Sequence, residues 1–385
     1  MKTYDWIVVG GGITGATLAY ELVKLGLSVL LLEKDAIPQN ATRYSYGGLA
    51  YWSGSTPLTR QLCQEAIARY QILSSELDAD IELRELDLLL TIDTDSDPQA
   101  TTASYANCAT PPRLISVQAA CELEPLLNQD AVSGALTVKH GHIHPQKTAQ
   151  AYIQAFLRCG GKMQITEVLQ ILPGGVKTTT ENYSCANVVV CAGGISRHLL
   201  KAVKIPLKLY FTHAEIIETP PVDLQLKTLV MPANLQRFKL EATATKNHQL
   251  WDESGNQSIA PILDTGAVQL CDGSLRLGQI SRILKDPYAN INSQDSENWL
   301  RQGITKVLPK LGNLPGTWHH CLVAFSSNSL PLIGAIPGYE GIHIFSGFSN
   351  PLVLVPPLAQ RFAKFVNGQE DEMITQLNQA LEMLN

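Results

Sequence analysis

Two short apolar runs near the amino terminus flank a stretch with helical spacing. The first run covers residues 6–9 and the second covers residues 28–32, and both have the composition of buried strands. Between them, residues 17–25 place apolar side chains at helical intervals and stop at Gly26, a residue type that commonly follows a helix end. The pattern predicts strand, turn, helix and strand in succession, which is one mononucleotide-binding βαβ unit.

Glycines fill the turn of this unit. Gly10, Gly12 and Gly15 have the spacing of dinucleotide-binding turns, where they allow a tight turn, a close approach of backbone to pyrophosphate, and close packing of helix on strand. The phosphates of such a ligand lie at a helix amino terminus. Glu33 ends the second strand, where a carboxylate meets a ribose hydroxyl. A glycine-rich turn in an ordinary α/β domain would not need Glu33, so we predict dinucleotide binding.

Further helix and strand patterns follow in the middle of the chain. Residues 62–77 predict a helix, residues 81–91 predict strands, and residues 93–112 are rich in Asp, Thr, Ser and Pro, as in an exposed excursion. Residues 163–172 and 187–191 predict more strands of the parallel sheet. The second of these strands is followed by a glycine turn, and ligands bind at such turns in open α/β sheets.

The pattern changes in the carboxyl-terminal half. From residue 207 to about residue 323 it alternates, and Asp272-Gly273 between two alternating runs predicts a hairpin. Residues 341–348 then predict a strand of the first sheet. Asn350 is a good helix N-cap and Pro351 a good first residue, so a helix is expected to start there and run to residue 366, with a kink at Pro356 and Pro357.

Composition narrows the possible functions. The chain has 385 residues, 45% hydrophobic and 17% charged, which suits two compact domains. Its 29 basic and 35 acidic residues give a net charge of −6, so no nucleic-acid partner is predicted. Eight cysteines without a C-x-x-C pair argue against a zinc knuckle or a disulfide framework and favour a reducing compartment. No signal peptide precedes the first strand and no apolar run suits a membrane span, so a cytoplasmic location without membrane contact is expected.

Three alternate histidines, His140, His142 and His144, share one face of a predicted strand. Histidines on one face can bind a metal ion, but no carboxylate or cysteine lies nearby at ligand spacing. A helical pattern over residues 145–159 follows directly. We therefore predict a junction between domains here and no metal.

The order of these motifs resembles the glycine oxidase, D-amino acid oxidase and monomeric sarcosine oxidase family of FAD flavoproteins. The resemblance covers nearly the whole chain and rests on six stretches: residues 8–15 with Glu33 and Lys34, Thr42 and Arg43 with residues 47–49, and residues 141–145, 188–193, 330–334 and 347–350. It implies an α/β fold, in which an FAD-binding dinucleotide fold (residues 1–80, 141–206 and 325–385) is interrupted by a mainly antiparallel α+β substrate domain (residues 81–140 and 207–324).

The resemblance also implies which residues bind FAD. Glu33 would hold the adenosine ribose, the 10–15 turn the pyrophosphate, and the backbone of Val168 the adenine side. The helix after Asn350 would point its positive end at the pyrimidine carbonyl of the isoalloxazine and stabilise the reduced flavin. The full implied set is Gly10, Gly12, Ile13, Thr14, Gly15, Glu33, Lys34, Thr42, Arg43, Gly47, Gly48, Leu49, Val168, Ala192, Gly193, Cys321, Gly347, Phe348, Ser349, Asn350, Pro351 and Leu352.

Cys321 belongs to this set as a candidate for covalent flavin attachment. It falls seven residues before Asn328. The resemblance places the flavin-linked cysteine of sarcosine oxidase at this position. The alternative is a small buried thiol in a strand.

The chain also departs from the family. The resemblance places a substrate-binding arginine at Val323, a second arginine at Ser349 and a substrate tyrosine near Val268. Pro351 replaces a usual glycine and Asn328 a usual aspartate, and residues 225–257 form a longer segment than their counterpart. The polar groups that hold an amino-acid carboxylate in relatives are thus absent from their usual positions.

The resemblance implies a flavoenzyme that moves hydride from the C–H beside an amine nitrogen to flavin N5. Oxidation of a 2-hydroxy acid, or a flavin-binding or electron-transfer subunit without an amine site, stays open as an alternative. Arg43 and Arg282 are the candidate catalytic residues, and both, with Lys239, are candidates for a substitute carboxylate clamp. Without such a clamp, we expect the substrate to be an amine with an apolar or aromatic body that packs against Tyr51, Trp52 and Phe325.

Overall fold

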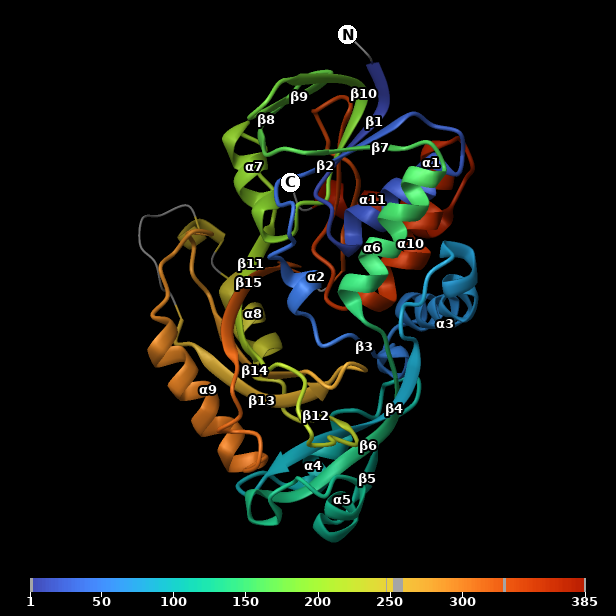
Figure 1. Ribbon diagram of the computed structural model, residues 1–385. Helices are drawn as coiled ribbons and strands as arrows, with labels where there is room; N and C mark the ends of the chain where they lie inside the picture. Colours follow the sequence, from blue (N-terminus) through green and yellow to red (C-terminus); the bar gives the residue numbers. More distant parts are fainter. Residues whose placement is uncertain (1–2, 247, 252–258, 328–329, 384–385) are drawn as a thin grey trace.

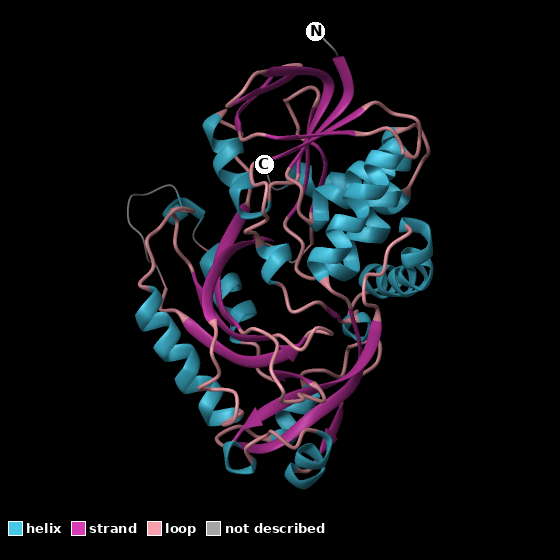
Figure 2. Ribbon diagram, viewed as in Figure 1, coloured by secondary structure: helices cyan, strands magenta, loops and turns pink. Residues whose placement is uncertain are grey.

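The computed structural model describes residues 3–246, 248–251, 259–327 and 330–383. Asn328 and part of the longer 225–257 segment therefore lie outside the described residues. The described chain forms two large sheets, a mainly parallel one at the top of Figure 1 and a long, curved one below it. Figure 2 shows that most of the helices lie beside these sheets, at the outside of the molecule.

The upper sheet is the predicted dinucleotide fold. Its strand order is β16-β17-β10-β1-β2-β7. Neighbouring strands from β17 to β7 pair in parallel, and β16 pairs with β17 in the antiparallel sense. The strands are β1 (Thr3–Val9), β2 (Val29–Glu33), β7 (Lys162–Ile165), β10 (Asn182–Val190), β16 (Leu332–Ala335) and β17 (Ile342–Ser346).

Both faces of this sheet are covered, which explains why its strands read as continuous apolar runs. Trp6 and Val8 of β1 point to the face packed by α1 (Ile13–Val23), α3 (Pro57–Leu77), α6 (Pro145–Arg158), α10 (Pro351–Val366) and α11 (Glu372–Met383). Ile7 and Val9 point to the opposite face, which α7 (Ser196–Ala202) and a hairpin cover.

That hairpin corrects one prediction. Residues 163–172 were expected to add to the parallel sheet, but only β7 does so. β8 (Val168–Leu172) turns back and pairs in the antiparallel sense with β9 (Gly175–Thr178), which in turn pairs with β10. Gly174 has a φ of +74°, and this left-handed conformation allows the tight turn between the two strands.

The lower sheet is mainly antiparallel, as predicted, with the order β15-β11-β14-β13-β12-β4-β6-β3 and β5 beside β6. One pair, β4 with β12, is parallel. The β13–β14 hairpin turns at the predicted Asp272-Gly273. The strands are β3 (Gly48–Leu49), β4 (Arg84–Asp93), β5 (Arg113–Ile115), β6 (Val132–His142), β11 (Leu209–Glu218), β12 (Leu229–Pro232), β13 (Ile262–Gln269), β14 (Leu275–Arg282) and β15 (Thr317–Ser326).

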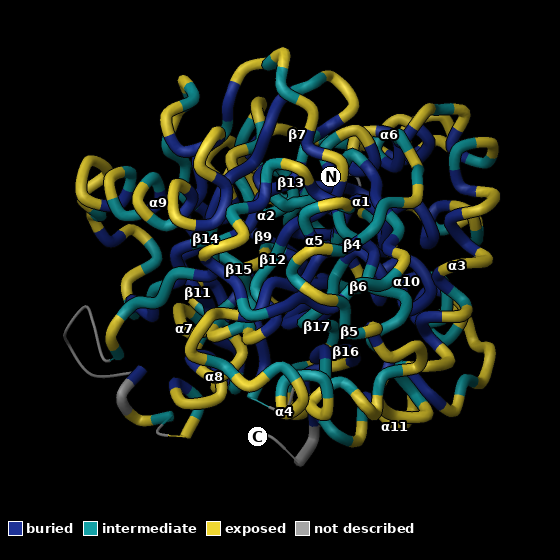
Figure 3. The backbone as a smooth tube through the Cα atoms, turned by 90° about the horizontal axis from the view of Figure 1, so that it is seen from below, coloured by how far each residue is buried: buried dark blue, intermediate teal, exposed yellow. Residues whose placement is uncertain are grey.

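Helices pack on the lower sheet from outside. Apolar residues of α9 (Ser293–Val307) and α5 (Val117–Leu123) form one core with strands β13 and β14. Of the three other short helices, α4 (Pro98–Ala103) lies in the excursion predicted for residues 93–112, while α2 (Ala41–Tyr44) and α8 (Gln236–Thr245) flank the space between the sheets. Figure 3 shows the buried segments inside and the exposed ones at the rim.

The expected division into two domains stays a prediction. The strands of the lower sheet fall mostly in the ranges expected for a substrate domain, but β6 and β15 each end two residues beyond those ranges. β3 lies wholly outside them and pairs with the end of β6. The helix predicted from residue 351 to 366 is confirmed as α10, and Pro356 and Pro357 lie inside it. Among the described residues, no helix combines the length and the apolar character that a membrane span requires.

Candidate functional site

A cavity of about 1150 Å³ lies between the two sheets. At one end it is lined by the turn after β1, by Glu33 and Lys34 at the end of β2, and by Val168. We call this the dinucleotide end. It continues past the 42–50 segment, the turn after β10 and the start of α10. At the other end, which we call the apolar end, its walls are Trp52, Leu88, Leu90, Tyr105 and Met231.

The dinucleotide end has no room for larger residues than glycine. Gly10 has a φ of +107°, and a Cβ there would lie 2.6 Å from the carbonyl oxygen of Cys191. A Cβ on Gly15 would lie 1.9 Å from the carbonyl oxygen of Gly10, so this glycine allows α1 to pack on β1. Glu33 accepts a hydrogen bond from the N–H of Gly11 at 2.6 Å, which holds its carboxylate at the edge of the cavity. This is the position where a ribose is bound in dinucleotide folds.

Two helix amino termini face the same cavity. α1 begins after Gly12 and α10 begins after Asn350, and neither N-cap residue makes a side-chain capping hydrogen bond. In α1, the N–H of Ile13 donates to the hydroxyl of Thr42 at 3.0 Å, and Thr42 also lines the cavity. The positive ends of both helix dipoles thus face the space where a ligand would lie. A dinucleotide has a negative pyrophosphate for the first helix, and a reduced flavin has a negative pyrimidine edge for the second. The residues present therefore fit FAD.

Most of the predicted cofactor residues line this cavity. They are Gly10, Gly12, Ile13, Thr14, Glu33, Lys34, Thr42, Gly48, Val168, Ala192, Gly193, Cys321, Gly347, Phe348, Ser349, Asn350, Pro351 and Leu352. Gly15, Gly47 and Leu49 are not lining residues and lie behind the wall. Gly47 has a φ of +81° and approaches the backbone of Ile143, and Leu49 is fully buried.

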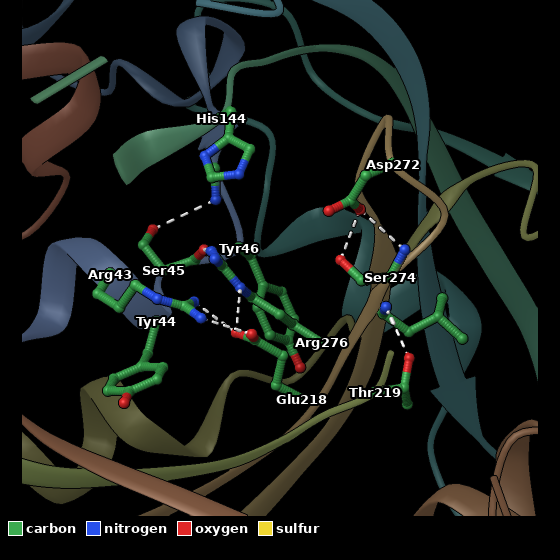
Figure 4. Close-up of polar contacts among 12 residues, drawn as sticks. Arg43, Tyr44, Ser45, Tyr46, His144, Glu218, Thr219, Asp272, Ser274 and Arg276 are labelled. Carbon is green, nitrogen blue, oxygen red and sulfur yellow. Dashed lines mark hydrogen bonds and ion pairs between the residues drawn. The ribbon is translucent and has the colours of Figure 1, made fainter. Parts of the chain in front are cut away.

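Arg43 is a predicted site residue that does not line the cavity. Its two terminal nitrogens bind both carboxylate oxygens of Glu218, at 2.5 and 2.6 Å. Arg276, which is fully buried, approaches the same carboxylate from the other side and donates to the carbonyl of Ser45. Figure 4 shows both arginines directed at Glu218. The cluster ties the 43–46 segment to β11 and β14, which is a structural role.

Arg282 is also already paired. It donates to Glu215, which is completely buried, at 2.5 Å and to Ser296 at 3.2 Å. Lys239 has an exposed side chain that donates to Asn234 at 2.7 Å. Neither residue lines the cavity, so the structure gives no support to Arg43, Arg282 or Lys239 as a carboxylate clamp.

Each of the three alternate histidines has a separate structural partner. His140 accepts a hydrogen bond from the indole N–H of Trp52 at 3.0 Å, and burial lowers its pKa to about 4. His142 lies between Arg84 and the carbonyl of Tyr46, and burial lowers its pKa to about 3. His144 is the N-cap of α6. Both buried rings are therefore neutral at pH 7. The segment leads from β6 of the lower sheet to α6 beside the upper one, and its interpretation as a junction between domains stays a prediction.

Cys321 lies on β15 and lines the cavity. Burial raises the pKa of its thiol to about 12, so it is protonated at neutral pH. The thiolate is the reactive form of cysteine, so a protonated thiol does not favour attachment. Covalent attachment of flavin stays a prediction. If a link exists, acid-precipitated protein should stay yellow, and the Cys321→Ser variant should release all its flavin. A colourless wild-type pellet, with the flavin in the supernatant, would exclude the link.

The apolar end corrects two further expectations. Trp52 lines it, but Tyr51 and Phe325 do not: Tyr51 packs on Tyr70, and Phe325 is buried beside Tyr210. Other residues that line the cavity were not anticipated from the sequence, among them Tyr105, Met231, Arg237 and Asp264. The last two meet at the start of α8, because Asp264 accepts the backbone N–H groups of Gln236 and Arg237 at 3.0 and 3.1 Å.

Comparisons with known proteins agree with this geometry. A family model described as DAO, FAD dependent oxidoreductase, matches residues 5–365. Glycine oxidase of Pseudomonas aeruginosa is 24% identical over 384 residues, which cover 94% of this chain and 95% of that protein. The solved glycine oxidase of Geobacillus kaustophilus has a TM-score of 0.78 at 21% identity and covers 97% of this chain and 96% of its own. The solved L-proline dehydrogenase from P. horikoshii has a TM-score of 0.75 at 20% identity, and the match covers 98% of this chain and 96% of its own.

The two structural likenesses show that the fold is shared, and the family match confirms the resemblance inferred from the motifs. Since that match spans most of the chain, the protein belongs to the DAO family of FAD dependent oxidoreductases.

Proposed function

We propose that the protein oxidises a small amine or amino acid at the C–H beside its nitrogen, and that this substrate has an apolar or aromatic body. The observation that carries the proposal is the apolar end of the cavity, which continues directly from the segments that fit the flavin. Trp52, Tyr105 and Met231 offer ring and thioether surfaces for such a body. Relatives named glycine oxidase and L-proline dehydrogenase support an amine as the reacting group.

FAD, when bound, supplies the hydride acceptor. The chain's own residues then have to bind the amine, orient its C–H and exclude water. An uncharged surrounding suits this task, because hydride leaves more readily from a neutral amine than from its positively charged ammonium form. His140 fits such a surrounding: it is neutral, and because its Nδ1 accepts from Trp52, its proton lies on Nε2. That Nε2 lies against Gly48, which lines the cavity.

The proposal predicts that glycine and D-alanine are poor substrates. Val323 and Ser349 line the cavity at the positions where the family resemblance places arginines. A bidentate arginine at either position would contribute on the order of 1.5 to 3 kcal/mol. Glycine and D-alanine also have no apolar body to bury at the apolar end, where a fully buried apolar group contributes a further amount of about 1.5 to 3 kcal/mol. Steady-state kinetics should therefore give much lower kcat/KM values for glycine and D-alanine than for secondary amines with an aromatic body. Glycine turnover as efficient as that of the aromatic amines would contradict this prediction.

A substrate screen tests the function itself. The FAD-loaded protein is mixed anaerobically with primary amines, secondary amines, amino acids and 2-hydroxy acids, and the loss of the oxidised flavin spectrum is followed. We expect amines or amino acids to bleach the flavin and the 2-hydroxy acids to leave it oxidised. Bleaching by 2-hydroxy acids alone would favour that class of substrate, and no bleaching by any compound would favour a flavin-binding or electron-transfer subunit.

We also propose that the protein works in the cytoplasm. All eight cysteines are free thiols, and Cys159 and Cys271 are exposed. Free exposed thiols are typical of proteins that work in a reducing compartment.

A further inference from the structure

Helix α8 brings a guanidinium to the wall of the cavity. Arg237 lies in the first turn of α8, lines the cavity and has a partly exposed side chain. Its Nε is 3.4 Å from a carboxylate oxygen of Glu241, one turn further along the helix. Within the part of the chain that the structure describes, no hydrogen bond involves its two terminal nitrogens. The outer edge of the guanidinium, which matches a carboxylate in a bidentate pair, is thus left for a ligand.

Arg237 also differs from the other cations near the cavity. Of the described residues that line it, two carry a lysine or arginine side chain, Lys34 and Arg237. Lys34 is at the dinucleotide end and pairs with Asp35 at 3.1 Å. Arg43 and Arg282 are bound to buried or half-buried glutamates behind the wall. Among the described lining residues, Arg237 is therefore the lysine or arginine that a negatively charged group outside the dinucleotide end can contact.

Arg237 lies over the same face of the lower sheet as Val323, the position where the family resemblance places an arginine. Thr212 of β11 is the antiparallel partner of Val323 on β15. The hydroxyl of Thr212 donates to Glu241 at 2.8 Å, and Glu241 holds Arg237. Since antiparallel partners have their side chains on the same face of a sheet, this chain of contacts places the guanidinium over the face that Val323 occupies. In agreement, burial raises the pKa of Cys321, which also lines the cavity, and the nearby charge of Arg237 opposes that rise.

The surroundings of α8 hold this arginine in place. Both oxygens of Asp264 accept backbone N–H groups at the start of the helix, and the guanidinium lies 5.1 Å from the ring centroid of Phe238. Burial raises the pKa of both Glu241 and Asp264, because an apolar surrounding disfavours their charged forms. Because Asp264 accepts backbone N–H groups with both oxygens, Glu241 is the carboxylate that competes with a ligand for the charge of Arg237.

We propose that Arg237 binds the carboxylate of the substrate, so that the preferred substrate is an amino acid with an apolar body and not a simple amine. This inference rests on the proposed oxidation of a C–H beside nitrogen, and it names the substrate class for that reaction. The clamp that relatives are expected to carry on a strand comes here from a helix in the longer 225–257 segment. Neither the position nor the residue was anticipated from the sequence.

Binding of benzoate, a carboxylate that cannot be oxidised in this way, tests the clamp without turnover. The dissociation constant is measured from the shift of the flavin spectrum in wild type, Arg237→Met, Arg237→Lys and Lys239→Met. We expect Arg237→Met to weaken binding by about 10- to 150-fold and Arg237→Lys to weaken it less. Lys239→Met is the matched control, because it removes one charge from the exposed side of the same helix and should change nothing.

A second variant keeps the test decisive if Arg237→Met does not fold. Glu241→Gln keeps an oxygen for the hydroxyl of Thr212 but removes the competing negative charge beside Arg237, so benzoate should bind several-fold more tightly. Unchanged or weaker binding in Glu241→Gln would overturn the proposal. So would equal affinity of wild type and a folded Arg237→Met, or no benzoate binding at all.

A matched pair of substrates separates this proposal from the proposed function. N-benzylglycine and N-benzylmethylamine share the amine and the aromatic body, and only the first has a carboxylate. Wild type should prefer N-benzylglycine, and Arg237→Met should lose that preference while it still oxidises N-benzylmethylamine. If both are oxidised with the same ratio in wild type and variant, the clamp is wrong and the function stands. If neither is oxidised, the function is wrong, and the benzoate result alone decides the role of Arg237 as an anion site.

Discussion

Replacing Arg282 by alanine is expected to lower the free energy of unfolding by about 3 to 5 kcal/mol, because the change leaves a buried charge without its partner. Glu215 is completely buried, and one of its oxygens accepts from Arg282 at 2.5 Å while the other accepts from the indole N–H of Trp318 at 3.1 Å. Without the arginine, the described part of the chain leaves the carboxylate one hydrogen-bond partner, the neutral indole of Trp318. Urea unfolding of the purified variant measures the effect.

Two controls show whether the charge is the cause. Arg282→Met combined with Glu215→Gln removes both charges and keeps an acceptor for Trp318, so it should recover most of the lost stability. Lys139→Ala breaks an exposed ion pair with Asp87 in the same sheet and should change stability by less than about 1 kcal/mol. If Arg282→Ala is as stable as wild type but loses activity on amino acids, Arg282 binds substrate after all and our description of the site is wrong.

Replacing Glu33 by alanine should weaken FAD binding by about 10- to 150-fold, which corresponds to a loss of about 1.5 to 3 kcal/mol. The carboxylate lines the dinucleotide end and is held there by the backbone N–H groups of Gly11 and Asp35, at 2.6 and 3.0 Å. A charged acceptor that is fixed in this way binds a ribose hydroxyl strongly. The dissociation constant of FAD, measured by quenching of flavin fluorescence, gives the size of the effect.

The control for Glu33 lies at the opposite end of the same strands. Asp5 accepts the N–H and the hydroxyl of Ser28 at the exposed start of β1, away from the cavity. Asp5→Asn removes one negative charge as well, so it should leave the affinity for FAD unchanged. Equal affinity of wild type and Glu33→Ala would show that the ribose is bound elsewhere.

The dinucleotide end could be predicted because its residues are close in the sequence. Strand, glycine turn, helix and Glu33 fall between residues 3 and 33, and each has a local signal. The start of α10 was found for the same reason, from Asn350 and Pro351. The structure added only that Asn350 leaves the helix end uncapped by its side chain, which suits a negatively charged ligand.

The apolar end could not be predicted in the same way, because it is assembled from distant segments. In the sequence, Arg43 and Arg282 look available to a substrate. In the structure, Arg43 binds Glu218 of β11, which is far along the chain, and Arg282 binds Glu215 on the strand next to its own. Arg237 reaches the region of Val323 only through Glu241 and the pairing of β11 with β15. Such long-range contacts depend on strand register, which single residues do not reveal.

The most direct test of the account is the anaerobic reduction of the bound flavin by N-benzylglycine, followed in a single turnover. Both carbons that flank the nitrogen are deuterated in a second sample. We predict that the unlabelled compound bleaches the oxidised flavin, that the deuterated compound does so several-fold more slowly, and that mandelate, a 2-hydroxy acid with an aromatic ring, has no effect. Bleaching by mandelate alone, or reduction at the same rate with and without deuterium, would contradict hydride transfer from the C–H beside the amine nitrogen as the step that reduces the flavin.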